Sequence, residues 1–227
     1  MDASRLTACT FDCYGTLIDW EGGLGTFLYD FALRRRDDRA NGRELRERWE
    51  AIQFEVIGGD YRRYSDVLAE SLRLLAAERG WSYSEEDGKA LARSMRSWQP
   101  FPDTRPALQH AHDAGLKLII VSNTDRDILE HSIRHMEVPI DAVVTAEDVG
   151  SYKPALPHFE RALEVVDAPA DQILHVAFGF KYDIGPAQEL GFRSAWVNRR
   201  GDPRPGAAVP DLEWRDLWGL AQLADGR

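Results

Sequence analysis

Asp12 is the carboxylate of this chain best placed to do chemistry, because it directly follows a short apolar segment. Residues 6–11 combine small, β-branched and aromatic side chains, which predicts a strand, and Gly15 allows a sharp turn after it. Open α/β sheets bind their ligands just beyond such strand ends. A carboxylate in that place can attack an electrophilic centre without first losing a proton. An isolated Asp after a strand can equally be a turn residue.

Two later segments add polar groups of the same kind. Residues 116–121 form an apolar run typical of a buried parallel strand, and the run ends in Ser122 and Asn123. Lys153 precedes Pro154, a residue type that can open a helix at its first position. A cation and two hydrogen-bonding side chains are therefore expected near the ends of neighbouring strands.

Asp183 completes the pattern, because it follows another apolar strand at residues 173–178. Taken alone, it would be interpreted as a helix cap. The order Asp, Ser and Asn, Lys, and Asp at successive strand ends resembles the haloacid dehalogenase-like (HAD) hydrolase superfamily along nearly the whole chain. Four motifs in the right order make this resemblance specific. The run Asp-Cys-Tyr-Gly-Thr-Leu at residues 12–17 looks like the 2-haloacid dehalogenase branch.

Two positions distinguish this chain from the phosphatases of that family. The phosphatases carry a second Asp two residues after the nucleophile, to protonate the leaving alcohol. Tyr14 stands there, and a phenol with a pKa of about 10 is a poor proton donor. They also use an Asp of the fourth motif to help bind Mg²⁺, where this chain has Phe178, which cannot ligate a hard cation. The resemblance then implies attack on carbon, with no metal and no cofactor.

The mechanism implied by the resemblance is covalent. Asp12 attacks the substrate carbon and expels a leaving group, and water then hydrolyses the ester. Lys153 would hold Asp12 ionised, since a nearby opposite charge favours the charged form. Asp183 would hold Lys153 and help to position the hydrolytic water. Hydrogen bonds to the nucleophile or to a substrate carboxylate are implied for Thr16, Ser122 and Asn123.

The leaving-group side departs from the family pattern. Well-known 2-haloacid dehalogenases place an Arg on an early cap helix, where Glu50 aligns here. A Tyr, a Ser and an Asn of those enzymes align with Phe159, Phe178 and Phe180. Aromatic edges can line an apolar or halide-holding pocket, but they are weaker anion partners than Arg. The expected substrate-binding residues are Tyr14, Trp20, Phe178 and Phe180.

Three functions from different classes stay open. The leading one is a metal-independent hydrolase that removes halide from a small 2-haloacid, or cleaves another activated carbon bond. The second is a phosphatase acting on a small phosphoester, which Tyr14 and Phe178 disfavour. The third is a catalytically weak HAD-fold protein that only binds its ligand, which the intact set of Asp12, Lys153 and Asp183 disfavours.

The elements that must position these residues form an α/β fold. A Rossmann-like parallel-sheet core is expected from residues 1–18 and 99–227, with a small helical cap at 19–98, inserted after the first strand. Residues 21–23 are expected to be a hinge into the cap or a loose loop. The other expected bounds are helices near 22–37, 42–57, 61–80, 84–97, 104–114, 125–136, 155–167, 183–191 and 211–224, and strands near 140–145 and 193–198.

The composition of the chain limits the kinds of molecule that it is expected to bind. A net charge of −10 argues against nucleic acid or an anionic membrane, since both select for a basic surface. No apolar run is long enough to span a membrane, and the N-terminus lacks the pattern of a signal peptide, so a cytoplasmic protein is expected. The expected partner is a small molecule, in the leading case a carboxylic acid, and a homodimer stays open. Cys9 and Cys13 are expected to be reduced, and His175 to be a core residue.

Overall fold

The chain builds a parallel β-sheet in the computed structural model, which describes residues 2–226. The strands lie in the order β3-β2-β1-β4-β5-β6, with every neighbouring pair parallel. Their bounds are β1 Ala8–Phe11, β2 Lys117–Ser122, β3 Ala142–Thr145, β4 Ile173–Ala177, β5 Arg193–Val197 and β6 Leu212–Trp214. Because β1 lies between β2 and β4, the ends that carry the expected site residues meet at one edge of the sheet.

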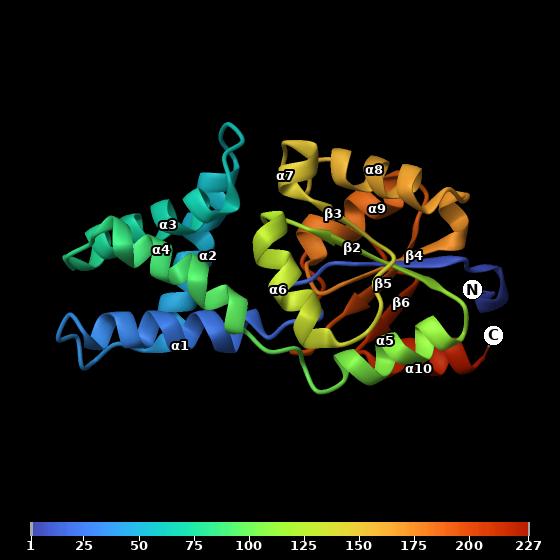
Figure 1. Cartoon of the computed structure of the whole chain (residues 1–227), viewed down its shortest axis with the longest axis horizontal. Coiled ribbons are helices and arrows are strands. Elements are labelled where there is room, and N and C mark those ends of the chain that lie inside the picture. The colour runs from blue at the N-terminus through green and yellow to red at the C-terminus, as the bar shows by residue number, and fades with distance from the viewer. Residues whose placement is uncertain (1, 227) are drawn as a thin grey trace.

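Helices cover both faces of this sheet (Figure 1). On one face, Cys9 and Phe11 pack in a core that includes side chains of α5, α6 and α10; on the other, Ala8 packs with side chains of α8 and α9. This alternation is the two-residue period of a strand buried on both sides. The bounds are α5 Thr104–Asp113, α6 Arg126–Met136, α7 Ala146–Val149, α8 Pro157–Val166, α9 Gly185–Glu189 and α10 Trp218–Asp225.

Four helices stand beside the sheet and form the cap (Figure 1). They are α1 Trp20–Leu33, α2 Gly42–Ile57, α3 Tyr64–Arg79 and α4 Glu85–Ser94. In α3, Leu68, Leu72 and Leu75 recur at helical spacing and are fully buried, which holds the bundle together. The expected α/β fold with a helical cap after the first strand is confirmed, and the bounds at residues 18 and 98 stay our proposal.

The two segments that connect cap and core lie side by side. Ile18 forms an antiparallel bridge with Pro100, and the backbone N–H of Phe101 donates to the carbonyl of Leu17 at 3.0 Å. The chain therefore leaves the core and returns to it at the same place. This arrangement leaves the opposite side of the cap without a covalent connection to the sheet.

The prediction of a helix at residues 211–224 is wrong for the first half of that range. Leu212–Trp214 is the edge strand β6, and the helix begins only at Trp218. Leu212 and Trp214 are half-buried and Glu213 is exposed, which is the alternation of a strand with one solvated side. Three residues are too few for this alternation to stand out in the sequence.

Three smaller expectations are also corrected. Residues 21–23 are not a loose loop, because they lie in the first turn of α1, and a hinge at this place stays a prediction. Gly23 is packed so tightly on the indole of Trp98 that a Cβ atom would lie 2.5 Å from it. Pro154 lies in a loop, and the proline that opens α8 is Pro157. Asp183 is not a helix cap, since it lies inside a short π-helical turn, Phe180–Ile184.

None of the helices within residues 2–226 is long and apolar enough to cross a membrane. The longest of them, α2 and α3, have 16 residues each and are amphipathic parts of the cap.

Candidate active site

Lys153 is the centre of the site. Its side chain is 1% exposed, and its ammonium donates three hydrogen bonds: to Asp12 Oδ1 at 3.0 Å, to Asp183 Oδ1 at 2.6 Å and to the carbonyl of Val121 at 2.9 Å. All three donor positions of the ammonium are thus satisfied in a buried place, where an unpaired charge would be very costly. The predicted proximity of Asp12, Lys153 and Asp183 is confirmed by these distances.

Asp12 is held on its other side by the turn that follows β1. The Thr16 hydroxyl donates to Asp12 Oδ2 at 2.8 Å and accepts from the backbone N–H of Phe178 at 2.8 Å. The backbone N–H of Asp12 donates to the carbonyl of Val176 at 3.1 Å, which continues the pairing of β1 with β4. Both carboxylate oxygens therefore have a donor, and the side chain is fixed in one orientation.

His175 extends the site into the sheet. Its Nε2 lies 3.1 Å from Asp183 Oδ1, and its Nδ1 lies 2.8 Å from the hydroxyl of Thr10. The expectation that His175 is a core residue is confirmed, since it is fully buried with a partner for each ring nitrogen, but its pairing with Asp183 was not predicted. The ring of Phe159 meets the imidazole edge to face at 5.1 Å and fixes its plane. A single His in an apolar strand gives no sign of this pairing in the sequence.

The charges of this set control one another. Burial raises the pKa of the Asp12 carboxyl above its ordinary value of 3.8; the Lys153 ammonium opposes that shift, and the charge of Asp183 adds to it. For Asp183, the charge of Lys153 and the hydrogen bond of His175 outweigh burial and lower the pKa. The two carboxylates likewise outweigh burial at Lys153 and raise the pKa of its ammonium. The site thus holds one firmly charged ion pair and one carboxylate that takes up a proton more readily.

We expect the pH profile to report the raised pKa of Asp12. If its ionised form is the reactive one, kcat/KM should fall as the pH falls through a value above 3.8, and the loss should begin at a higher pH than an ordinary aspartate would give. Lys153, whose pKa is raised above 10.5, should cause no loss up to pH 9. Rates measured from pH 3 to 9, with circular dichroism at each pH, test this. A midpoint at or below pH 3.8 in folded protein would contradict it.

A cavity of about 340 Å³ opens in front of Asp12, between cap and core. Ten of the 26 described residues that line it are aromatic, and they come from both parts of the molecule. Of the residues predicted to bind substrate, Tyr14, Trp20, Phe178 and Phe180 all line it, as do Ser122 and Asn123. The structure thus brings this set together, except that Thr16 lies behind Asp12 rather than in the cavity wall.

Three of these side chains have partners that bear on their roles. The amide of Asn123 binds the backbone of Lys153 through both of its polar atoms, at 2.7 and 3.1 Å, so it braces the lysine loop. The Tyr14 hydroxyl lies 3.0 Å from the Ser132 hydroxyl, and burial raises the pKa of the phenol well above its usual value. Ser122 Oγ is buried and has no hydrogen-bond partner among the described residues.

Of the positions that differ from the family pattern on the leaving-group side, Glu50 lines the cavity and Phe159 does not. Phe159 is fully buried in the sheet core and does not line the cavity, so its expected place in the wall is wrong. Glu50 does line the cavity, from α2. Burial raises the pKa of this carboxyl, and its nearest cation, Arg46 Nη1, lies 3.7 Å away. A cap wall with an acid at this point differs in charge from one with an arginine.

Other cavity residues were missed in the sequence. They are Trp49, Gln53, Tyr64, Tyr152, Tyr182 and Arg200. Trp49 and Gln53 lie one helical turn apart on α2, so they share a face, and that spacing could have linked them. Arg200 lies in the loop after β5 and is already paired with Glu21 at 2.8 Å and with Asp202 at 2.7 Å. Loop residues brought in from a distance give no such periodic signal.

In the described part of the chain, the two cysteines and the possible metal-binding side chains do not form a second reactive site. Neither Cys9 nor Cys13 takes part in a disulfide, as expected, and burial raises the pKa of Cys13 well above its usual value. A thiol held protonated in this way is a poor nucleophile. Within residues 2–226, no group of three or more His, Cys, Asp or Glu side chains is arranged to hold a metal ion.

The fold and this site define a hydrolase of the haloacid dehalogenase-like class. The sequence model of the haloacid dehalogenase-like hydrolases matches residues 6–191, and the chain belongs to that family.

Curated relatives and solved structures refine the comparison. The chain is 26% identical to (S)-2-haloacid dehalogenase H-109 of Pseudomonas putida, over 91% of this chain and 92% of that protein. It is 23% identical to haloacetate dehalogenase H-2 of Moraxella sp. (strain B), over 87% and 88% of the two chains. A crystal structure of an L-2-haloacid dehalogenase superposes with a TM-score of 0.83 at 27% identity, covering 97% of this chain and 99% of the other.

Proposed function

We propose that the protein hydrolyses a carbon–halogen bond of a small 2-haloacid, with Asp12 as the nucleophile and no metal. The observation that carries this proposal is the contact of Lys153 with both Asp12 and Asp183 at the floor of an aromatic cavity. The relatives named above, which are haloacid dehalogenases, support the choice of substrate. The buried phenol at Tyr14 supports it as well, since a group of raised pKa is a weak acid for an alcohol leaving group.

In the first step, an Asp12 oxygen attacks the halogen-bearing carbon, and the halide leaves with the bonding electrons. Lys153 and Thr16 orient the carboxylate, each holding one of its oxygens. Ser122 Oγ has no hydrogen-bond partner among residues 2–226, so we assign it a hydrogen bond to the substrate carboxylate. We assign to the aromatic side chains of the cavity the role of limiting the access of water to the anion during attack, which makes the nucleophile more reactive.

In the second step, water attacks the carbonyl carbon of the Asp12 ester. The hydroxyl of the water adds to that carbon, the 2-hydroxy acid leaves with the original Asp12 oxygen, and one proton is released. Asp183 is the group suited to orient this water, because its low pKa keeps it ionised and His175 holds it in place. Asp12 is thereby regenerated as a carboxylate.

A substrate panel tests the function. Chloro-, bromo- and fluoro-acids are incubated beside phosphoesters, and released halide and phosphate are both quantified, with Mg²⁺ or EDTA added in separate arms. We expect halide release that neither addition changes. Phosphate release that depends on Mg²⁺ would show a phosphatase instead, and binding of the acids without turnover would show a binding protein. An Asp12→Asn preparation serves as the blank.

Phe180 is predicted to set the order of preference among those acids. It lines the cavity and packs edge to face on Trp196 at 5.0 Å. Phe180→Asn should make the wall more polar and shift relative kcat/KM values within the panel by roughly 10- to 200-fold, while attack by Asp12 persists. Profiling wild type and variant on the same panel checks this. An unchanged order in a folded variant would mean that Phe180 is only a core residue.

A further inference from the structure

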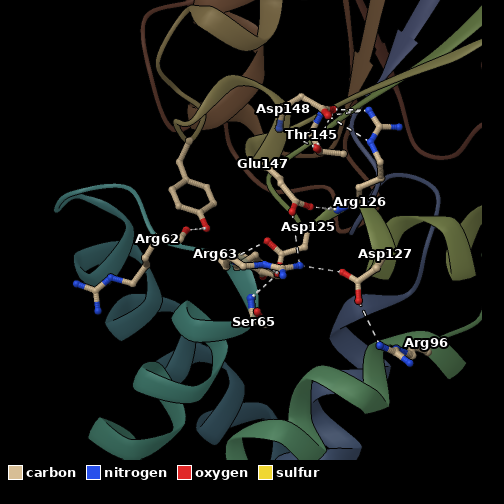
Figure 2. A network of polar contacts seen from close by, with 12 residues as sticks. Arg62, Arg63, Ser65, Arg96, Asp125, Arg126, Asp127, Thr145, Glu147 and Asp148 are labelled. Atoms are coloured by element: carbon tan, nitrogen blue, oxygen red, sulfur yellow. Dashed lines mark hydrogen bonds and ion pairs between the residues drawn. The ribbon is translucent and has the colours of Figure 1, made fainter.

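On the side away from the covalent connection, cap and core are joined by a group of polar contacts (Figure 2). Its centre is Asp125, at the start of α6, whose side chain is 0% exposed. Asp125 Oδ1 accepts from the backbone N–H of Tyr64 at 2.8 Å, and Oδ2 accepts from that of Ser65 at 3.0 Å. A carboxylate of the core thus binds the first turn of the cap helix α3.

The start of α3 differs from the starts of α1 and α2, the two helices that precede it in the cap. Helices α1 and α2 are capped by their own neighbouring side chains, Asp19 and Asn41. The residue before α3 is Arg63, which makes no such capping bond. The first N–H groups of a helix lack acceptors inside the helix, so they need one from elsewhere. In α3 that acceptor comes from the core, and it is available only when the cap is seated on the core.

Arg63 and Asp127 surround this contact at the surface. Arg63 lies 3.5 Å from Asp125 Oδ2 and 3.3 Å from Asp127 Oδ1, and Asp127 also pairs with Arg96 at 3.2 Å (Figure 2). The side chain of Asp127 is 53% exposed, against 0% for Asp125. Exposed ion pairs contribute little to stability. Asp127 is therefore a matched control for Asp125, a buried carboxylate only two residues away.

The contact connects directly to the cavity at both ends. Tyr64, whose backbone Asp125 holds, lines the cavity, and its hydroxyl accepts from the Gln53 amide at 2.6 Å. Its ring also lies 6.3 Å from that of Tyr152, another cavity residue. On the core side, Asp125 is two residues beyond Asn123, which braces the backbone of Lys153. One short loop therefore holds the lysine of the site and the cap wall opposite it.

We propose that Asp125 is a positioning residue: by binding the start of α3, it keeps the cap closed and holds Tyr64 at the cavity wall. Its kinetic consequence rests on the proposed hydrolysis, whereas its structural consequence does not. If closure is needed to bind substrate, a smaller closed fraction raises the apparent KM by the same factor and leaves kcat nearly unchanged, because bound substrate restores closure.

The test compares Asp125→Asn with Asp127→Asn. Asn keeps the shape of Asp125 but has one acceptor oxygen, so one backbone N–H meets an NH₂ group instead. Hydrogen exchange of the ligand-free protein should become about tenfold faster or more at Tyr64 and Ser65 in Asp125→Asn, and stay unchanged in Asp127→Asn. KM for the preferred acid should rise about tenfold in the first variant, with kcat within about threefold, and stay within about twofold in the second.

Each outcome decides one point. Exchange and KM that match the Asp127 control would overturn the proposal. Faster exchange with an unchanged KM would reduce Asp125 to a helix cap and overturn its positioning role. If Asp125→Asn does not fold, Asp125→Ser, which keeps one capping oxygen, is measured by the same two readouts and judged by the same criteria. A wild-type protein that releases no halide defeats the proposed function alone, because the exchange comparison needs no substrate.

Discussion

Asp12→Asn is expected to reduce turnover by at least about a thousandfold while the fold persists, because an amide is a far weaker nucleophile of nearly the same shape. The amide oxygen can still accept from Lys153, and the NH₂ group then lies against the Thr16 hydroxyl, whose oxygen can accept a second hydrogen bond beside that of the Phe178 N–H. Halide release in steady state measures the loss, and mass spectrometry of the variant excludes deamidation back to aspartate. Activity above a few per cent of wild type, without deamidation, would show that Asp12 is not the nucleophile.

The matched control for this variant is Asp19→Asn. Asp19 lies in the same connecting segment but caps α1, accepting from the N–H of Gly22 at 2.9 Å, and asparagine caps helices equally well. The Asp19→Asn variant should retain nearly full activity.

A single turnover of wild type in ¹⁸O water then distinguishes an ester intermediate on Asp12 from direct attack by water on the substrate. An ester hydrolysed at its carboxyl carbon leaves the label in Asp12 and unlabelled oxygen in the product, whereas direct attack by water puts the label in the product.

Lys153→Met should lower kcat at least about a hundredfold, which is typical of removing a key electrostatic group from an enclosed site. The change keeps most of the length of the side chain and removes its charge. Asp12 and Asp183 would then be two buried carboxylates without their shared cation, so one of them would take up a proton. The midpoint of the acid limb should accordingly move to higher pH, and the rate profile from pH 4 to 9 measures both effects.

Lys181→Met is the control for the loss of a lysine from the cavity. Lys181 also lines the cavity, but its side chain is exposed, so its removal should change kcat by no more than about threefold. Unfolding curves of both variants show whether the Lys153 effect is chemical or a loss of folded protein. Near-normal kcat in folded Lys153→Met would overturn the assigned role of this lysine.

The parts of the fold that depend on local pattern could be predicted from the sequence. Strands β2 and β4 are long apolar runs, and α3 carries its buried leucines at helical spacing, so each is specified by its own residues. The edge strand β6 could not be predicted, because it has three residues and depends on pairing with β5. Its neighbouring strand, rather than its own pattern, decides its conformation.

For the site residues too, those that follow a local sequence pattern could be predicted, and those that depend on distant contacts could not. Asp12, Lys153 and Asp183 could be predicted, because each follows a recognisable strand or motif and parallel strand ends meet at one edge. The role of His175 could not, since its contact with Asp183 depends on a π-helical turn that returns the carboxylate toward β4. Nor could the contact of Asp125 with α3, which joins positions about 60 residues apart and depends on how the cap is seated.

The position of β1 in the sheet has a consequence for the order in which the protein is made. This strand ends at residue 11, but its two neighbours begin only at residues 117 and 173. During synthesis the four cap helices are complete before either neighbour leaves the ribosome, so the cap can assemble while β1 still has no strand to pair with. The nascent chain must therefore carry an unpaired apolar strand, which is prone to aggregation, at least until β2 is complete at residue 122 of 227. The segment that bears Asp12 is thus synthesised long before the strands that hold it in the sheet.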